Sequence, residues 1–450
     1  MSASDSWKLL IFRDGRRVCN GPELLHALSQ QLQHTLSLRD FHPQNTLEEL
    51  MEALLRSGEL ECAVADHDGC ELQAKALATL TDELAFALVS KSSSRISPNI
   101  WQSLRAMELP DRLALSTPEG FCYYALHPLD YVDALNESGI HAPEAAVVGI
   151  RSIGTTLSAV VRAYFSQRGV PAERITVRPT GHPFDRKLAL DDKQREWVHR
   201  KAAANALFLV VDEGPGLSGS SFLAVAEALV GAGASQNRIV LMPSSTPDLG
   251  SLFAPDAKAR WSCFTTVPLR PTRHIPAEAT QHVGCGEWRK RVFPSQEQWP
   301  AVWTWTERKK YLSTDGTHIF RFGGYGHYGK AVRQRLEMLH ADGWGPEASG
   351  AGDGFNMMPW IQGTRPLQAD RDTVVRLAGY CAFRATHFQS YPVSNAALEQ
   401  MAQINLERAL GITHPVALPL ERPVIADARM MPHEWIYSSD GRLLKVDSAS

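Results

Sequence analysis

The chain has 450 residues, of which 44% are hydrophobic and 21% charged, values typical of folded globular proteins and not of disordered chains. Its 46 basic and 49 acidic side chains give a formal net charge of −3, which argues against a protein that coats nucleic acid or an acidic membrane. The seven cysteines include no CxxC pair, and the N-terminus lacks the apolar core of a signal peptide. We therefore expect a cytoplasmic protein with no nucleic-acid or membrane partner, and about 150 residues per domain suggests three units.

The first ninety residues have the apolar pattern of helices. Large apolar residues repeat at helical spacing over residues 24–32 and again over 47–55, and Gly58 is a natural end for the second helix. We expect a helical N-terminal region, residues 1–95, followed by a linker around Ser90–Pro98.

The middle of the chain alternates predicted strands with predicted helices, which favours an α/β fold with a parallel sheet over residues 96–272. The predicted strands cover residues 145–150, 174–178, 206–211 and 238–242, and the predicted helices cover 157–165, 193–204 and 222–230.

The most informative segment joins the apolar strand that ends at Val211 to a helix. Asp212 and Glu213 stand at the carboxyl end of this strand, and a loop of small residues leads directly into the helix: Gly216, Leu217, Ser218, Gly219, Ser220 and Ser221. Small residues let backbone N–H groups approach an anion, serine hydroxyls add donors, and a helix N-terminus favours negative charge. The loop therefore suits a phosphate, and the carboxylates suit hydroxyls or a cation, as in a ribose 5-phosphate site. Taken singly, each piece is also consistent with a solvated strand end or a helix cap without a ligand.

This segment resembles the 5-phosphoribosyl 1-pyrophosphate (PRPP) binding motif of type I phosphoribosyltransferases, in which two acidic residues precede a Thr/Ser-Gly-x-Thr/Ser loop. The preceding strand leads into Arg151, Ser152, Ile153, Gly154 and Thr155, which resemble the family's pyrophosphate loop. The polar stretch Pro179–Asp192 lies where the family has a flexible catalytic loop. The resemblance covers residues 118–270. The chain departs from the motif in one extra loop residue and in Glu213, where Asp is commoner.

The resemblance implies a magnesium-dependent transferase that moves the phosphoribosyl group of PRPP to a small, nitrogen-containing acceptor and releases pyrophosphate. Asp212 and Glu213 would contact the ribose hydroxyls and Mg²⁺, and the loops 151–155 and 216–221 would bind PRPP. Arg186 and Lys187 would neutralise the departing pyrophosphate; a solvated basic loop is the alternative for these two cations. A homodimer is left open.

The C-terminal region, residues 285–450, mixes strands and helices in an α+β pattern. We expect strands at residues 317–322, 355–361 and 443–446, helices at 330–340 and 370–387, and a tryptophan-rich helix over 299–305.

Parts of this region resemble small-molecule kinases of the aminoglycoside phosphotransferase type. Gly354–Gly363 resembles the hinge strand of that family, and Asp427–Trp435 with Asp447 lies where its catalytic and metal-binding segments would be. The His-Gly-Asp…Asn catalytic loop is missing, and Arg321 stands at the position expected for the nucleotide-facing lysine. The resemblance therefore implies a kinase-like remnant with a structural or regulatory role.

Two alternatives to the transferase stay open. One is a regulator that senses PRPP or a nucleotide and keeps the pocket without the chemistry. The other is an ATP-dependent phosphotransferase in the C-terminal region, where Arg429, His433 and Glu434 would gather near Asp447.

Overall fold

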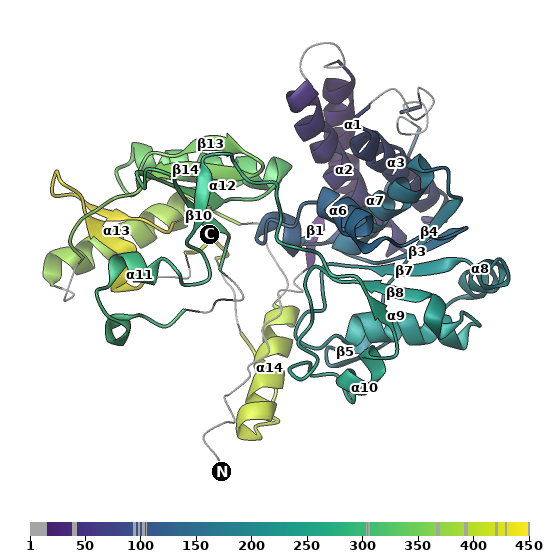
Figure 1. The fold of residues 1–450 in the computed structure, drawn as a ribbon. Coiled ribbons are helices and arrows are strands. Elements are labelled where there is room, and N and C mark those ends of the chain that lie inside the picture. Colours follow the sequence, from purple (N-terminus) through teal and green to yellow (C-terminus); the bar gives the residue numbers. More distant parts are fainter. Residues whose placement is uncertain are drawn as a thin grey trace. The chain divides into compact units, whose positions relative to one another are not determined.

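The computed structural model describes residues 16–37, 43–92, 96–97, 100, 104, 106–302, 304, 307–365, 370–390, 395–418, 422–427 and 430–448. The chain divides into two compact units (Figure 1). Unit 1 consists of Met1–Pro118 and Leu126–Arg273, and unit 2 of Glu119–Ala125 and His274–Ser450. No helix among these described ranges is long and apolar enough to cross a membrane.

The N-terminal region is helical, as predicted, with α1 at Gly21–Ser37, α2 at Pro43–Ala65 and α3 at Glu71–Ser90. A two-stranded antiparallel sheet, β1 (Arg16–Cys19) and β2 (Leu113–Ser116), accompanies them. The expected helix end at Gly58 is wrong, because α2 continues to Ala65. A Cβ atom on Gly58 would lie 2.0 Å from Thr156 Oγ1, so this glycine permits close packing of two helices instead of ending one.

Unit 1 contains a five-stranded parallel sheet in the order β4-β3-β7-β8-β9, a Rossmann-like α/β arrangement. The strands are β3 (Ala145–Ile150), β4 (Ala172–Val177), β7 (Leu207–Val211), β8 (Ile239–Met242) and β9 (Thr265–Thr266). Helices α6 (Leu129–Ser138) and α7 (Ile153–Gln167) lie on one face, and α9 (Ser220–Gly231) lies on the other (Figure 1). Helices α8 (Asp192–Ala203) and α10 (Ala257–Trp261) complete the domain. The predicted parallel sheet and its main strands are confirmed within a residue or two.

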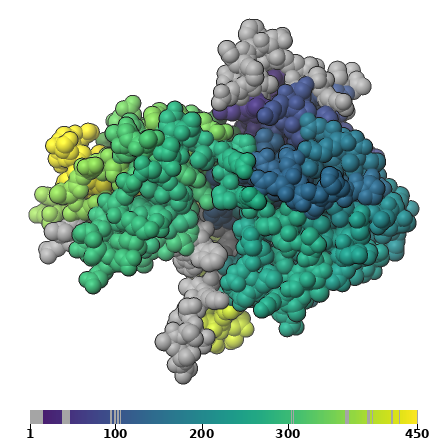
Figure 2. Space-filling view, viewed as in Figure 1, coloured from purple at the N-terminus to yellow at the C-terminus, as the bar shows by residue number. Residues whose placement is uncertain are grey.

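Helix α7 is enclosed by the sheet on one side and by α2 and α3 on the other. All but one residue from Ile153 to Phe165 are buried, including Thr155 and Ser158, which is the pattern of a helix covered on every side. Buried Arg174 on β4 ties the two layers together through Glu61 of α2 (2.8 Å) and Asp82 of α3. In Figure 2 the surface passes without a break from the N-terminal helices to the teal residues of the sheet domain.

Unit 2 is built on an antiparallel sheet in the order β10-β11-β12-β14-β13. Its strands are β10 (Ala279–His282), β11 (Lys310–Ser313), β12 (His318–Phe322), β13 (Ser349–Gly352) and β14 (Phe355–Pro359). Helix α12 (Gly326–Ala341) connects β12 to β13 and packs on the sheet through Val332 and Leu336. The strand and helix predictions for 317–341 and 355–359 are therefore confirmed.

A second apolar cluster in unit 2 is formed by Leu339, Tyr380, Phe388, Trp435 and Leu443. It joins α12 to α13 (Arg371–His387), β15 (Trp435–Tyr437) and β16 (Leu443–Lys445). The other elements of unit 2 are α5 (Glu119–Cys122), α11 (Arg289–Val292) and α14 (Ala396–Leu410). The predicted tryptophan-rich helix is wrong over Trp299–Val302, which is not helical. Pro300 lacks the N–H that a helix interior needs; Trp303 and Trp305 lie outside the described residues.

Candidate active site

Two predicted loops meet at the carboxyl edge of the parallel sheet. Strand β3 lies between β4 and β7. After β3 the chain forms β4 on one side of it and then crosses over to form β7 on the other side. In open α/β sheets, such a reversal in strand order is the usual position of a ligand site. The loops that follow β3 and β7 flank this point. They contain every predicted PRPP-binding residue.

The loop after β3 is short and tightly placed. Ser152 has a φ of 131°, a strained conformation for a non-glycine residue and one that is concentrated at functional sites. A Cβ atom on Gly154 would lie 2.6 Å from the Val211 carbonyl oxygen and 3.2 Å from Asp212 Oδ1, so only glycine allows the two loops to touch. Ile153 and Thr155 are buried in the first turn of α7. Their contribution to a ligand site would come from the backbone.

Asp212 lies where the two loops touch. Burial raises the pKa of its carboxylate to about 7, although the backbone N–H groups of Glu213 and Gly154 and the charge of Arg178 act in the opposite direction. Tyr131 Oη donates to the Asp212 carbonyl oxygen at 2.6 Å and fixes this backbone. The carboxylate therefore sits at the N-terminus of α7, a position that favours an anion. Tyr131 was missed in the sequence because it lies 81 residues before Asp212.

The serine loop is covered by a hairpin. Strands β5 (Thr180–His182) and β6 (Asp185–Lys187) form an antiparallel pair within the stretch that was expected to be a flexible loop. The carbonyl oxygen of Pro183, at its turn, accepts hydrogen bonds from Ser218 Oγ (2.8 Å) and Ser220 Oγ (2.7 Å). This oxygen therefore accepts the hydrogen bonds of two serine hydroxyls that were predicted to bind a phosphate. Gly219 caps α9, Ser221 is half-buried in its first turn, and Gly216 and Leu217 lie on the exposed side of the loop.

The structure separates the two predicted pyrophosphate cations, because adjacent residues of a strand face opposite ways. Arg186 is half-buried, and its positive charge lowers the pKa of Asp212. The Lys187 side chain is 71% exposed and pairs with Asp185 at 2.7 Å. Of these two cations, only Arg186 is therefore near Asp212.

The N-terminal helices also contribute to this edge. Asp66, at the end of α2, accepts from Arg151 Nη1 at 3.0 Å and from Arg178 Nη2 at 2.5 Å. These hydrogen bonds and charges outweigh its burial and hold its pKa below the usual value. The Arg151 side chain therefore faces Asp66, and its availability to a ligand depends on this ion pair. Nothing in the sequence shows that Asp66 reaches the sheet edge.

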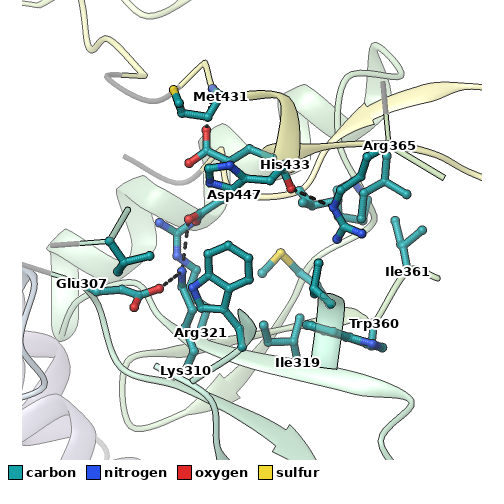
Figure 3. Close-up of a pocket in the computed structure, with 18 of the residues that line it drawn as sticks. Glu307, Lys310, Ile319, Arg321, Trp360, Ile361, Arg365, Met431, His433 and Asp447 are labelled. Atoms are coloured by element: carbon teal, nitrogen blue, oxygen red, sulfur yellow. Dashed lines mark hydrogen bonds and ion pairs between the residues drawn. The ribbon is translucent and has the colours of Figure 1, made fainter. Parts of the chain in front are cut away.

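Unit 2 contains a separate cavity of about 260 Å³ (Figure 3). One side is formed by Glu307, Lys310, Arg321 and Asp447, and the opposite side includes Trp360, Ile361 and Arg365. Lys310 Nζ pairs with Glu307 at 2.8 Å and with Asp447 at 3.1 Å. Arg321 Nη1 lies 2.6 Å from the second oxygen of Asp447.

The predicted kinase-like residues are only partly brought together here. His433, Glu434 and Asp447 all line the cavity, whereas Arg429 lies outside the described residues. Glu434 and Asp427 pair with the fully buried ammonium group of Lys445 at 3.3 and 3.1 Å. Asp447, expected at the metal-binding position, is held by two cations. The sequence did not single out Lys310 or Lys445; Lys310 reaches Asp447 across 137 positions.

No protein-family model matches this sequence, and no curated protein matches it. The assignment of function therefore depends on the geometry of the two sites.

Proposed function

We propose that unit 1 binds PRPP and transfers its phosphoribosyl group to a small nitrogen acceptor, with release of pyrophosphate and with Mg²⁺ as cofactor. The observation that carries the proposal is the contact between Gly154 and Asp212 at the point where the strand order reverses. It supports a single site built from both loops, with the phosphate and pyrophosphate ends of one ligand on different helix N-termini.

The 5-phosphate would take the place of the Pro183 carbonyl. Ser218 and Ser220 already aim both hydroxyls at one oxygen atom, and a phosphate oxygen accepts the same two hydrogen bonds with a charge in addition. The N-terminus of α9, at Ser220, would add favourable backbone dipoles.

The carboxylates of Asp212 and Glu213 fit Mg²⁺, which prefers oxygen ligands and keeps several waters. A carboxylate has about four lone-pair positions, so Asp212 has room for a cation beside the backbone N–H groups of Glu213 and Gly154, which favour its charged form. When bound there, Mg²⁺ would offset negative charge on the pyrophosphate.

The reaction breaks the bond between ribose C1 and the pyrophosphate oxygen, and the electron pair leaves with pyrophosphate. The acceptor nitrogen donates its lone pair to C1 and gives up its proton. Arg186 stabilises the leaving group, the backbone of residues 151–155 orients it, and the hairpin over the serine loop excludes water.

A second candidate, a PRPP sensor without chemistry, is favoured by one observation. Pro183 and Asp66 occupy the groups that would hold the ligand, so PRPP must displace both contacts. In a sensor, the displacement of these two contacts would itself be the conformational signal.

Pyrophosphate release from PRPP tests both candidates. The full chain is incubated with PRPP, a panel of nucleobases and either Mg²⁺ or EDTA. We expect release that requires both Mg²⁺ and one acceptor, and that Glu213→Gln lowers. PRPP binding without release on any acceptor favours the sensor, and absence of PRPP binding contradicts both.

A further inference from the structure

The cavity in unit 2 combines matched charges with a cation, Arg365, for which the described part of the chain offers no acidic partner. Lys310 and Arg321 are less than one-tenth exposed, and Glu307 and Asp447 compensate them. An incoming ligand is therefore not needed to neutralise this side of the cavity. Because both oxygens of Asp447 face cations, the cluster is not arranged to hold a metal ion.

Arg365, on the other side, differs from these cations. Its Nε donates to the His433 carbonyl oxygen at 3.1 Å, and within the described ranges no carboxylate pairs with its guanidinium. Burial alone lowers its pKa from the usual value. A partly desolvated cation is costly unless it finds an anion. The planar guanidinium is suited to bind a carboxylate or phosphate through two parallel hydrogen bonds.

Apart from His433 and Glu434, the remaining walls are apolar and include two tryptophans. The Trp288 ring stacks on His433 with centroids 5.4 Å apart and an interplanar angle of 24°. Met358, Ile319 and Trp360 are among the other lining residues, and Figure 3 shows Ile319 and Trp360 across the cavity from Arg365. Aromatic and thioether side chains bind rings well. At about 260 Å³, the cavity is smaller than the roughly 300–1,000 Å³ typical of drug-sized ligands, which favours a compact molecule.

We propose that this cavity binds a small aromatic anion, a carboxylate or a phosphate monoester, whose ring packs on the tryptophans and whose acidic group pairs with Arg365. The site lies within unit 2 and does not depend on the function proposed for unit 1. It binds without a metal ion and without covalent chemistry.

The test is calorimetry of the full chain with benzoate, phenyl phosphate, benzyl alcohol and benzylamine, in EDTA. The two anions should bind, and whichever binds more tightly identifies the acidic group. Benzyl alcohol should bind at least about tenfold more weakly, because a charge-assisted pair is lost. Benzylamine should not bind.

Variants make the test specific to Arg365. Arg365→Met should weaken anion binding by roughly 10- to 100-fold, and Arg365→Lys should recover part of it. Trp360→Ala should weaken binding of both anions and of the alcohol. Arg442→Gln, which changes an exposed arginine paired with Asp440, is the matched control and should bind as the parent does.

Any of the following results would overturn the proposal. One is that neither anion binds at concentrations on the order of 10 mM, the weak limit of specific recognition. Another is equal affinity for benzoate and benzyl alcohol, or anion binding that survives Arg365→Met. A further result is tight binding of magnesium–ATP that is insensitive to Arg365, which would instead make the cavity the nucleotide site of a phosphotransferase. PRPP titrations of the same variants test unit 1 separately, so the two proposals can fail independently.

Discussion

The sheet edge of unit 1 and the cavity of unit 2 are both suited to anions, but they are built differently. In unit 1 the donors are backbone N–H groups and short hydroxyls from consecutive residues, placed by the ends of two parallel strands. In unit 2 the proposed donor is the long charged side chain of Arg365, and the neighbouring charges pair with one another across the sequence, as Lys310 does with Asp447, 137 positions away.

The two regions also differ in how their charges are balanced. In unit 1 internal groups occupy the proposed ligand contacts: Pro183 on the serines and Asp66 on Arg151. A ligand there must replace existing contacts. In unit 2 the buried charges pair with one another and leave Arg365 as the group that gains most from a ligand. The arrangement in unit 1 suits a site that opens and closes, whereas the arrangement in unit 2 suits a preformed site.

The largest expected effect comes from breaking the charge balance of unit 2. Lys445→Met removes a fully buried ammonium group and leaves Asp427 and Glu434 without their cation. Removing one partner of a buried ion pair typically costs about 3–5 kcal/mol. Urea unfolding should show this loss. Arg442→Met breaks an exposed pair instead and should cost less than about 1 kcal/mol; equal losses would show that the burial of Lys445 has no energetic role.

In unit 1, packing between helices should matter more than surface charge. Gly58→Ala places a methyl group 2.0 Å from Thr156 Oγ1, and overpacking of this kind costs roughly 1–3 kcal/mol. Gly231→Ala, at the end of α9, has no atom within 4 Å of the added carbon. It should be neutral or slightly stabilising. The midpoints of thermal unfolding compare the two, and a tolerated Gly58→Ala would contradict the close approach of α2 to α7.

Substitutions of Arg186 and Lys187 test which of the two cations acts at the sheet edge. Arg186→Ala should lower turnover by roughly 10- to 100-fold with a much smaller change in PRPP affinity, because the contact is made with the leaving group. Lys187→Ala, the adjacent exposed position, should leave both values near those of the parent. Steady-state rates and calorimetry measure the two quantities. Equal effects of the two variants would contradict the position of the hairpin over the serine loop.

The smallest predicted effect is a pH dependence of PRPP binding. Since burial raises the pKa of Asp212 to about 7, its carboxylate is mostly protonated at pH 6 and mostly charged at pH 8. Hydroxyls and Mg²⁺ require the charged form, so affinity should rise about tenfold over this range. The phosphates of PRPP also titrate near pH 6, and Asp212→Asn separates the two causes. The variant should lose the part of the increase that belongs to Asp212.

The elements of the parallel sheet could be predicted from sequence because each buried strand is a continuous apolar run, as in residues 206–211. The serine loop could be located for the same reason, since it directly follows such a strand. The hairpin at residues 180–187 could not, because its strands are three residues each and partly exposed. The ion pairs of Asp66 with Arg151 and of Lys310 with Asp447 also escaped prediction, because pairs across 85 and 137 positions depend on the tertiary fold. The helix end predicted at Gly58 was wrong for a related reason, because the role of this glycine depends on its packing against a neighbouring helix.

The most direct test of the central proposal is calorimetry of PRPP binding to the full chain in Mg²⁺, for the parent and for Asp212→Asn. Serine hydroxyls and helix N-termini would hold the phosphates, while the acidic pair would hold the ribose and the cation. The account predicts that the parent binds PRPP in a Mg²⁺-dependent manner and that Asp212→Asn weakens binding at least about tenfold. Ser235→Ala, an exposed serine far along the chain from both loops, serves as the control and should bind normally. Unchanged affinity in Asp212→Asn, or no binding of PRPP to the parent, would contradict a PRPP site at this sheet edge.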